Sequence, residues 1–132
     1  MGPAPALQGI MLSGEQASLE DFRGKPVLVH FWATWCPICR TEEGSIDSLA
    51  ADYPVLTVAT GSGEAADIRK YLADNDLEFP VLMDESGMLG VRWGIRGVPS
   101  SFVVDADGQI RHVAVGYTTE LGLRIRLWLA GF

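Results

Sequence analysis

The feature that most constrains this chain is an apolar run that leads directly into a pair of cysteines. Residues 26–32 read Pro-Val-Leu-Val-His-Phe-Trp, almost without a polar interruption. Such a run is typical of a strand that is buried on both faces of a sheet. Four residues after Trp32 comes Cys36-Pro37-Ile38-Cys39. Pro37 suits the first turn of a helix, because the N–H that proline lacks has no partner there. The pattern predicts an α/β sheet with helices on both faces.

The rest of the chain continues this alternation. We expect helices over about 37–52, 64–73, 86–93 and 121–130, the second capped by Ser62 and the last amphipathic. We expect strands over 55–59, 79–82, 102–104 and 110–115, the last two joined as a hairpin by the turn DADG. Residues 1–24 are expected to form an irregular or hairpin-like extension. Since 132 residues is the size of one domain, we expect a single domain over 1–132.

Charge and hydropathy exclude several classes of function. The formal net charge is −7, whereas a protein that binds nucleic acid needs a basic face. The same charge argues less strongly against an anionic membrane surface. No stretch is long and apolar enough to span a bilayer. Residues 1–5 lack the basic and apolar regions of a signal peptide, which alone predicts a cytosolic protein; a start just after a removed signal or anchor fits them equally well.

Cys36 and Cys39 are the only cysteines of the chain. Cys36 is expected at a helix N-terminus, where unpaired N–H groups and the helix dipole favour the thiolate. Cys39 lies one helical turn further on and can close a disulfide with Cys36. The arrangement suits thiol–disulfide exchange, in which Cys36 attacks, a mixed disulfide forms and Cys39 resolves it.

Other uses of two cysteines have to be weighed. A zinc site needs two further ligands, and His30 and His112 lie too far apart in sequence to supply them. A structural disulfide that closes four residues would add little stability. Capture of copper(I) by the two thiolates is chemically reasonable, because copper(I) prefers soft ligands. A copper(I) carrier therefore stays open as the alternative function.

The segment KPVLVHFWATWCPICRTEEGSI, residues 25–46, resembles the active-site region of the thioredoxin superfamily. More narrowly, it resembles the TlpA/DsbE-like branch, which includes copper-sensitivity-suppressor-like proteins. The downstream segment WGIRGVPSSFVVDADGQI, residues 93–110, resembles the same branch. The resemblance implies a thioredoxin-like fold, with a central mixed β-sheet flanked by helices on both faces. It also implies a protein-disulfide oxidoreductase that needs no cofactor.

The resemblance further implies partners and a location. Proteins of this branch act on cysteine-containing proteins and exchange electrons with an upstream thiol–disulfide partner. They usually face the periplasm or the cell exterior, held by an N-terminal anchor. We therefore expect an extracytoplasmic, monomeric protein whose native form is anchored to the inner membrane. The redox direction stays open, because the helix terminus favours an oxidant whereas Glu42 and the acidic surface oppose one.

The same resemblance assigns the substrate-binding residues. Pro99 would be a cis-proline beside the thiols, and the Val98 backbone would receive an extended substrate segment as an added strand. Without the resemblance, a trans proline that opens an edge strand is the alternative. Trp35 and Pro37, which flank Cys36, complete the expected substrate contact. Glu42 matches an acid that follows the second cysteine; its alternative is a solvated position on the helix surface.

His30 departs from the family pattern. It stands six residues before Cys36, where thioredoxin carries a buried aspartate and this branch often a neutral residue. Burial should lower the pKa of its imidazole below the ordinary value of about 6.5. It is either a core histidine whose ring bonds to a backbone carbonyl, or the base that accepts the Cys39 proton during resolution. Glu42 is the rival base.

A thiol peroxidase is a third possible function within the same broad fold. Such enzymes resemble this family but carry P-x-x-x-[ST]-x-x-C around the reactive cysteine. Here the corresponding positions are Val29 and Ala33. The polar group that would orient a peroxide is therefore missing.

Overall fold

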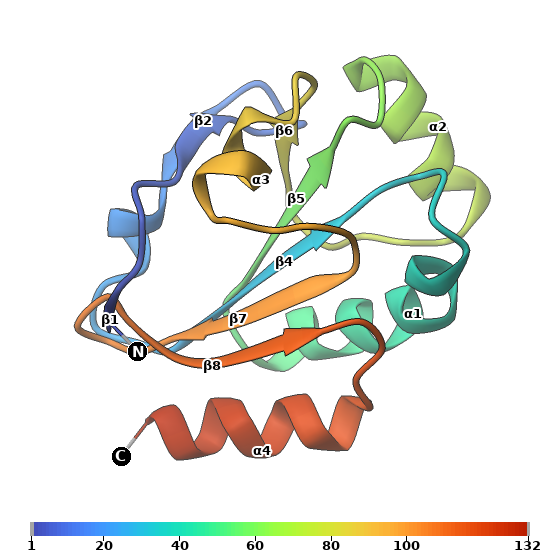
Figure 1. The fold of residues 1–132 in the computed structure, drawn as a ribbon. Coiled ribbons are helices and arrows are strands. Elements are labelled where there is room, and N and C mark those ends of the chain that lie inside the picture. The colour runs from blue at the N-terminus through green and yellow to red at the C-terminus, as the bar shows by residue number, and fades with distance from the viewer. Residues whose placement is uncertain (1, 132) are drawn as a thin grey trace.

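Strand β4 (Val27–Trp32) lies inside a six-stranded sheet in the computed structural model, which describes residues 2–131 (Figure 1). The strand order is β1-β8-β7-β4-β5-β6. β4 runs parallel to β5 (Val55–Thr60) and antiparallel to β7 (Ser100–Val104). The sheet is therefore mixed, as predicted. All six residues of β4 are buried, which agrees with a strand covered on both faces.

The remaining elements complete the sheet and its two layers. The other strands are β1 (Gly2–Pro3), β2 (Gln8–Ile10), β3 (Gln16–Ser18), β6 (Val81–Asp84) and β8 (Gln109–Val115). The helices are the 3₁₀ helix η1 (Leu19–Phe22), α1 (Pro37–Asp52), α2 (Ala65–Asp74), α3 (Met88–Arg92) and α4 (Glu120–Ala130). β2 and β3 pair as a small separate sheet, while β1 adds to the edge of the main sheet beside β8.

The two faces of the sheet carry separate apolar clusters. Leu28 and Trp32 of β4 pack with residues of α1, α2 and α4 on one face. Val29 and Phe31 pack on the other face with α3 and the N-terminal segment (Figure 1). Because side chains alternate along a strand, His30 lies on the same face as Leu28 and Trp32. The strand therefore directs His30 toward the layer that contains α1.

Strand β6 begins two residues later than predicted. The expected strand over 79–82 is found at Val81–Asp84. Pro80 has no N–H to give to a ladder, so regular pairing starts only after it. The Pro80 carbonyl oxygen is nevertheless used: it accepts hydrogen bonds from the N–H of Thr57 at 3.2 Å and from its Oγ1 at 2.7 Å.

Ser62 does not cap α2, which corrects the sequence-based prediction. The N-cap is Glu64, whose backbone N–H donates to Asp67 Oδ2 at 2.9 Å. Ser62 Oγ instead accepts the Thr34 N–H at 3.0 Å and donates to the Thr60 carbonyl oxygen at 3.1 Å. Ser62 therefore joins the loop after β5 to the turn that precedes the cysteines.

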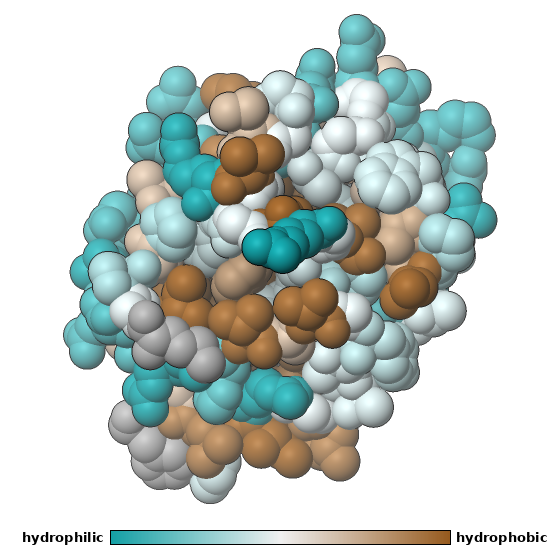
Figure 2. All heavy atoms as spheres, viewed as in Figure 1, coloured by the Kyte–Doolittle hydropathy of each residue, from teal (hydrophilic) through white to brown (hydrophobic). Residues whose placement is uncertain are grey.

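Helix α4 is apolar on its outer face as well as on its inner face. Leu123, Leu127 and Ala130 are buried against the sheet, while Leu121 is 67 % exposed and Ile125 48 %. Figure 2 shows apolar side chains along the edge of the molecule that α4 forms. The expected amphipathic pattern is therefore only partly present. Among residues 2–131, no helix is long and apolar enough to cross a membrane.

Candidate active site

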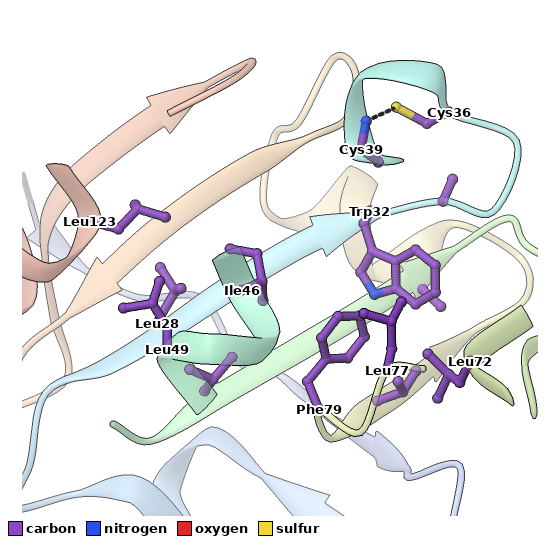
Figure 3. Close-up of a cluster of buried hydrophobic side chains, with 14 of the residues drawn as sticks. Leu28, Trp32, Cys36, Cys39, Ile46, Leu49, Leu72, Leu77, Phe79 and Leu123 are labelled. Carbon is purple, nitrogen blue, oxygen red and sulfur yellow. Dashed lines mark hydrogen bonds between the residues drawn. The ribbon is translucent and has the colours of Figure 1, made fainter. Parts of the chain in front are cut away.

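Cys36 is the N-cap residue of α1, as its position before Pro37 predicts. Its Sγ accepts the backbone N–H of Cys39 at 3.2 Å (Figure 3). Its S–H donates to the Val98 carbonyl oxygen at 3.5 Å. Both cysteines are free thiols. Cys36 is only 4 % exposed, and its sulfur contacts the chain at Val98.

The bond between Val98 and Pro99 is cis, as the resemblance predicts. Pro99 is buried, while Val98 is partly exposed. The turn before β7 is held by a hydrogen bond from Ser100 Oγ to the Gly97 carbonyl oxygen at 2.8 Å. This turn therefore places a backbone carbonyl beside the Cys36 thiol and keeps it there.

Three exposed apolar side chains surround the cysteine turn. Trp35 is 64 % exposed, and its Nε1 donates to the Gly61 carbonyl oxygen at 3.0 Å. Pro37 is also exposed. Ile38 is 51 % exposed. Trp35, Pro37 and Ile38 therefore form an exposed apolar rim around the cysteine turn.

Cys39 lies beneath this turn and is nearly inaccessible. It is 1 % exposed, and Figure 3 shows it above the ring of Trp32, which in turn packs on Phe79. Burial raises the pKa of the Cys39 thiol to about 12, and the nearby Cys36 sulfur and Glu42 carboxylate also raise it. Cys39 therefore needs a base before it can act as a nucleophile.

The His30 side chain is buried, at 2 % exposed. Its ring contacts another side chain, that of Ser101. Its Nδ1 lies 2.8 Å from Ser101 Oγ and 3.6 Å from Glu42 Oε1. Burial lowers the pKa of the imidazole to about 3, in the direction that the sequence predicts. The ring is therefore neutral near pH 7, and its approach to Glu42 is a polar contact rather than an ion pair.

Glu42 is fully buried, so its interpretation as a solvated surface residue is wrong. Its Oε2 accepts the Thr118 backbone N–H at 2.6 Å. Its Oε1 has no hydrogen-bond partner among the described residues. Burial raises the pKa of this carboxyl group, and the Thr118 N–H opposes that rise only in part. A buried carboxyl group with a raised pKa is a typical proton acceptor in an active site.

Sequence reasoning missed Ser101 and Thr118. The ladder between β4 and β7 sets Ser101 directly opposite His30, although 71 residues separate them. Thr118 reaches Glu42 from the loop between β8 and α4. Period-two alternation after Pro99 would have placed Ser101 on one face of its strand, but only the strand register brings it to His30.

The same geometry bears on a zinc site and on a thiol peroxidase. Within residues 2–131, no group of three or more His, Cys, Asp or Glu side chains is placed to hold a metal ion. Val29 and Ala33, which stand where a peroxidase would need proline and a hydroxyl group, are both fully buried. The site thus combines a thiol at a helix N-cap, a second, buried thiol and a buried carboxyl group. These are the groups that thiol–disulfide exchange uses.

Comparison with known proteins also indicates thiol–disulfide exchange. The AhpC/TSA family matches residues 2–113. A thioredoxin-like protein of Haemophilus influenzae is 40 % identical over 123 residues, covering 92 % of this chain and 73 % of that protein. The thiol:disulfide interchange protein DsbE of Pseudomonas fluorescens is 35 % identical over 127 residues, covering 95 % of this chain and 71 % of that protein.

A solved structure extends the comparison to three dimensions. The exposed lipoprotein thioredoxin of Streptococcus pneumoniae matches with a TM-score of 0.84 and 28 % identity. The match covers 94 % of this chain and 98 % of that structure. The thioredoxin-like fold predicted from the sequence is therefore confirmed over almost the whole chain.

Proposed function

The chain belongs to the AhpC/TSA family of thioredoxin-like proteins and is a protein-disulfide oxidoreductase, and from this premise we propose that Cys36 is its attacking thiol and Cys39 its resolving thiol. The observation that carries the proposal is the place of Cys36 at the N-cap of α1, with the Cys39 N–H directed at its sulfur. A negative charge on that sulfur is favoured by the N–H group and by the helix dipole.

The exchange proceeds in two steps. In the reducing direction, the Cys36 thiolate attacks one sulfur of a substrate disulfide, and the other substrate sulfur leaves as a thiolate that takes a proton. Cys39 then attacks the Cys36 sulfur of the mixed disulfide. This step forms the Cys36–Cys39 bond and releases the second substrate thiol. The protein gives up two thiol protons and two electrons, and the substrate gains both.

Glu42 accepts the proton of Cys39 in the second step. His30 and Glu42 are the two candidate bases, and burial changes their pKa values in opposite directions. The pKa of His30 falls to about 3, whereas that of Glu42 rises. A proton shared between the two therefore resides on the carboxyl group. His30 contributes as a neutral polar partner beside Glu42 Oε1. Resolution measured from pH 5 to 9 should slow more in Glu42→Gln than in His30→Ala, and the reverse order would make His30 the acceptor.

The substrate binds along the turn that precedes β7. The Val98 carbonyl accepts the Cys36 S–H in the resting protein, and it becomes free when that thiol ionises. It can then accept an N–H from an extended substrate segment. Pro99, Trp35 and Pro37 supply the surrounding apolar contact. The partners are cysteine-containing proteins, with an upstream thiol–disulfide protein to restore the active redox state.

Catalysed reduction of insulin tests the activity. With dithiothreitol as electron donor, the protein should shorten the time before the reduced insulin chains precipitate, and Cys36→Ser should not. A wild-type protein that leaves this time unchanged would contradict the proposal. The reduction potential then gives the direction: about −270 mV indicates a thioredoxin-like reductant, and about −120 mV an oxidant.

A copper(I) titration of the reduced protein tests the alternative function. Two thiolates are a suitable copper(I) pair. A carrier should bind one equivalent tightly and lose this binding in Cys39→Ser, while adding nothing to insulin reduction. An active protein that binds copper(I) only weakly is an oxidoreductase alone.

The remaining features concern organisation and location. The proposal includes a single thioredoxin-like domain that acts as a monomer. The protein works outside the cytoplasm, anchored at the inner membrane in its native form. The similar pneumococcal protein is an exposed lipoprotein, which supports this location. Light scattering tests the oligomeric state, and fractionation of cells that express the full gene product tests the location.

A further inference from the structure

Ser101 is a buried polar side chain that the exchange of two thiols does not by itself require. It is 2 % exposed and stands on β7, directly opposite His30 of β4. Residues opposite one another on antiparallel strands bring their side chains together on one face of the sheet. Here this pairing sets Ser101 Oγ 2.8 Å from His30 Nδ1.

The contacts of His30 Nδ1 show which group holds the ring. Ser101 Oγ lies within hydrogen-bond distance of this nitrogen, whereas Glu42 Oε1, at 3.6 Å, lies just beyond it. Ser101 therefore fixes the ring, and Glu42 does not. The ring so fixed keeps Nδ1 3.6 Å from Glu42 Oε1, the carboxyl oxygen that lacks a hydrogen-bond partner among the described residues.

A hydroxyl group suits this position better than the backbone carbonyl that the sequence suggested. A carbonyl only accepts, so it would hold the ring only while Nδ1 carries a proton. A serine hydroxyl can either donate or accept. A Glu42 carboxylate favours a protonated Nδ1 facing it, and a protonated carboxyl group favours a bare Nδ1. Ser101 can therefore keep the ring in place in both protonation states of Glu42.

We propose that Ser101 is a positioning residue, which holds the His30 ring beside Glu42 while the ionised carboxylate of Glu42 takes up the proton of Cys39. The proposal rests on the proposed functions of Cys39, Glu42 and His30. In this step the Cys39 sulfur loses its proton to Glu42 and bonds to the Cys36 sulfur. The substrate sulfur leaves with the electron pair of the mixed disulfide. Ser101 gains or loses no atom and only redirects its hydroxyl hydrogen.

Nitrogen NMR of the histidine rings tests the contact directly. His30 and His112 are the only histidines of the chain, so His112→Asn assigns the signals. In the reduced, ¹⁵N-labelled full chain, Ser101→Ala should move the Nδ1 resonance of His30, and Ser101→Thr should return it toward the wild-type position. Ser100→Ala is the matched control. Ser100 is equally buried at 2 %, but its Oγ donates to Gly97, so the His30 signals should stay in place.

The rate of mixed-disulfide resolution tests the role. Loss of one hydrogen bond should slow resolution roughly two- to tenfold in Ser101→Ala, and Ser101→Thr should recover most of the rate. Because Ser101 acts through His30, the double variant His30→Ala/Ser101→Ala should resolve no more slowly than His30→Ala alone. The comparison of the double variant with His30→Ala does not depend on Ser101→Thr, so it still tests the role if the threonine methyl group does not fit beside His30.

Each outcome decides a separate question. An unmoved Nδ1 resonance in Ser101→Ala overturns the contact. A moved resonance with an unchanged rate, or equal slowing in the His30→Ala background, overturns the positioning role. If His30→Ala itself resolves at the wild-type rate, the proposed function of His30 fails instead. If the wild-type protein catalyses no exchange, the oxidoreductase assignment fails.

Discussion

His30 Nδ1 lies 3.6 Å from Glu42 Oε1, and both side chains are buried. Burial moves the two groups in opposite directions: it lowers the pKa of His30 to about 3 and raises that of Glu42. Both groups are thus held toward their neutral forms. The site keeps polar groups near the thiols without placing a permanent ion pair in the core.

The lowered pKa of His30 predicts a loss of stability in acid. Above pH 6.5 the imidazole is neutral in the folded and the unfolded chain. Between pH 6.5 and about 3 only the unfolded chain takes up this proton, so the free energy of unfolding falls with falling pH. The slope from this one group is up to about 1.4 kcal/mol per pH unit. Urea unfolding at pH 7, 6, 5 and 4 should show this slope reduced in His30→Asn.

His112→Asn is the control for that measurement. The pKa of His112 is also lowered, by partial burial and by Arg126 and Arg111, but the residue stands on the half-exposed strand β8. Its substitution should therefore change the slope less. Equal slopes in wild type and His30→Asn would contradict the neutral, buried state of His30.

The raised pKa of Glu42 predicts the opposite trend toward alkaline pH. The contribution of this group to stability is present below its ordinary pKa of 4.5 and is lost as the pH rises through the raised value in the folded protein. Glu42→Gln removes the ionisation and keeps an oxygen that can accept the Thr118 N–H. The variant should thus be more stable than wild type at pH 8, with a smaller difference at pH 5. A variant less stable than wild type at pH 8 would show that the carboxylate itself stabilises the fold.

Local features of the site follow from the sequence. The apolar run predicts the buried strand β4, and Cys36-Pro37 predicts the first turn of α1, since N-cap and N1 preferences depend on neighbouring residues alone. The cis bond before Pro99 follows from the resemblance. Each of these features depends on residues that are close in sequence or on a short motif that the resemblance covers.

Contacts between distant segments do not follow from the sequence. Ser101 reaches His30 only through the register of β4 against β7, and Thr118 reaches Glu42 through the path of a loop. The burial of Glu42 depends on how α1 packs on the sheet and against α4. From the sequence alone, Glu42 could lie on the exposed or on the buried side of α1. The apolar pattern of a short helix does not define its buried face to within one residue.

Two glycines in helices should respond differently to alanine. Gly44 lies exposed in the middle of α1, and an added Cβ would meet no atom within 4 Å. Gly44→Ala should raise the free energy of unfolding by about 0.5–1 kcal/mol, because alanine loses less conformational freedom in a helix. In α3 a Cβ at Gly90 would lie 2.9 Å from Ile95 Cδ1, so Gly90→Ala should be neutral or destabilising. Urea unfolding at pH 7 measures both; a destabilised Gly44→Ala would mean that α1 depends on this glycine.

The two thiols should differ in reactivity near neutral pH. Burial raises the pKa of Cys39 to about 12, so very little of it is thiolate at pH 7, whereas the Cys36 sulfur receives an N–H at the start of α1. Brief treatment of the reduced protein with iodoacetamide, followed by peptide mass spectrometry, should therefore find Cys36 alkylated first. In urea, where both sites are open, the two rates should converge. With a disulfide substrate, Cys39→Ser should accumulate the mixed disulfide, while Cys36→Ser should form none. Faster alkylation of Cys39 in the folded protein would reverse the roles of the two cysteines.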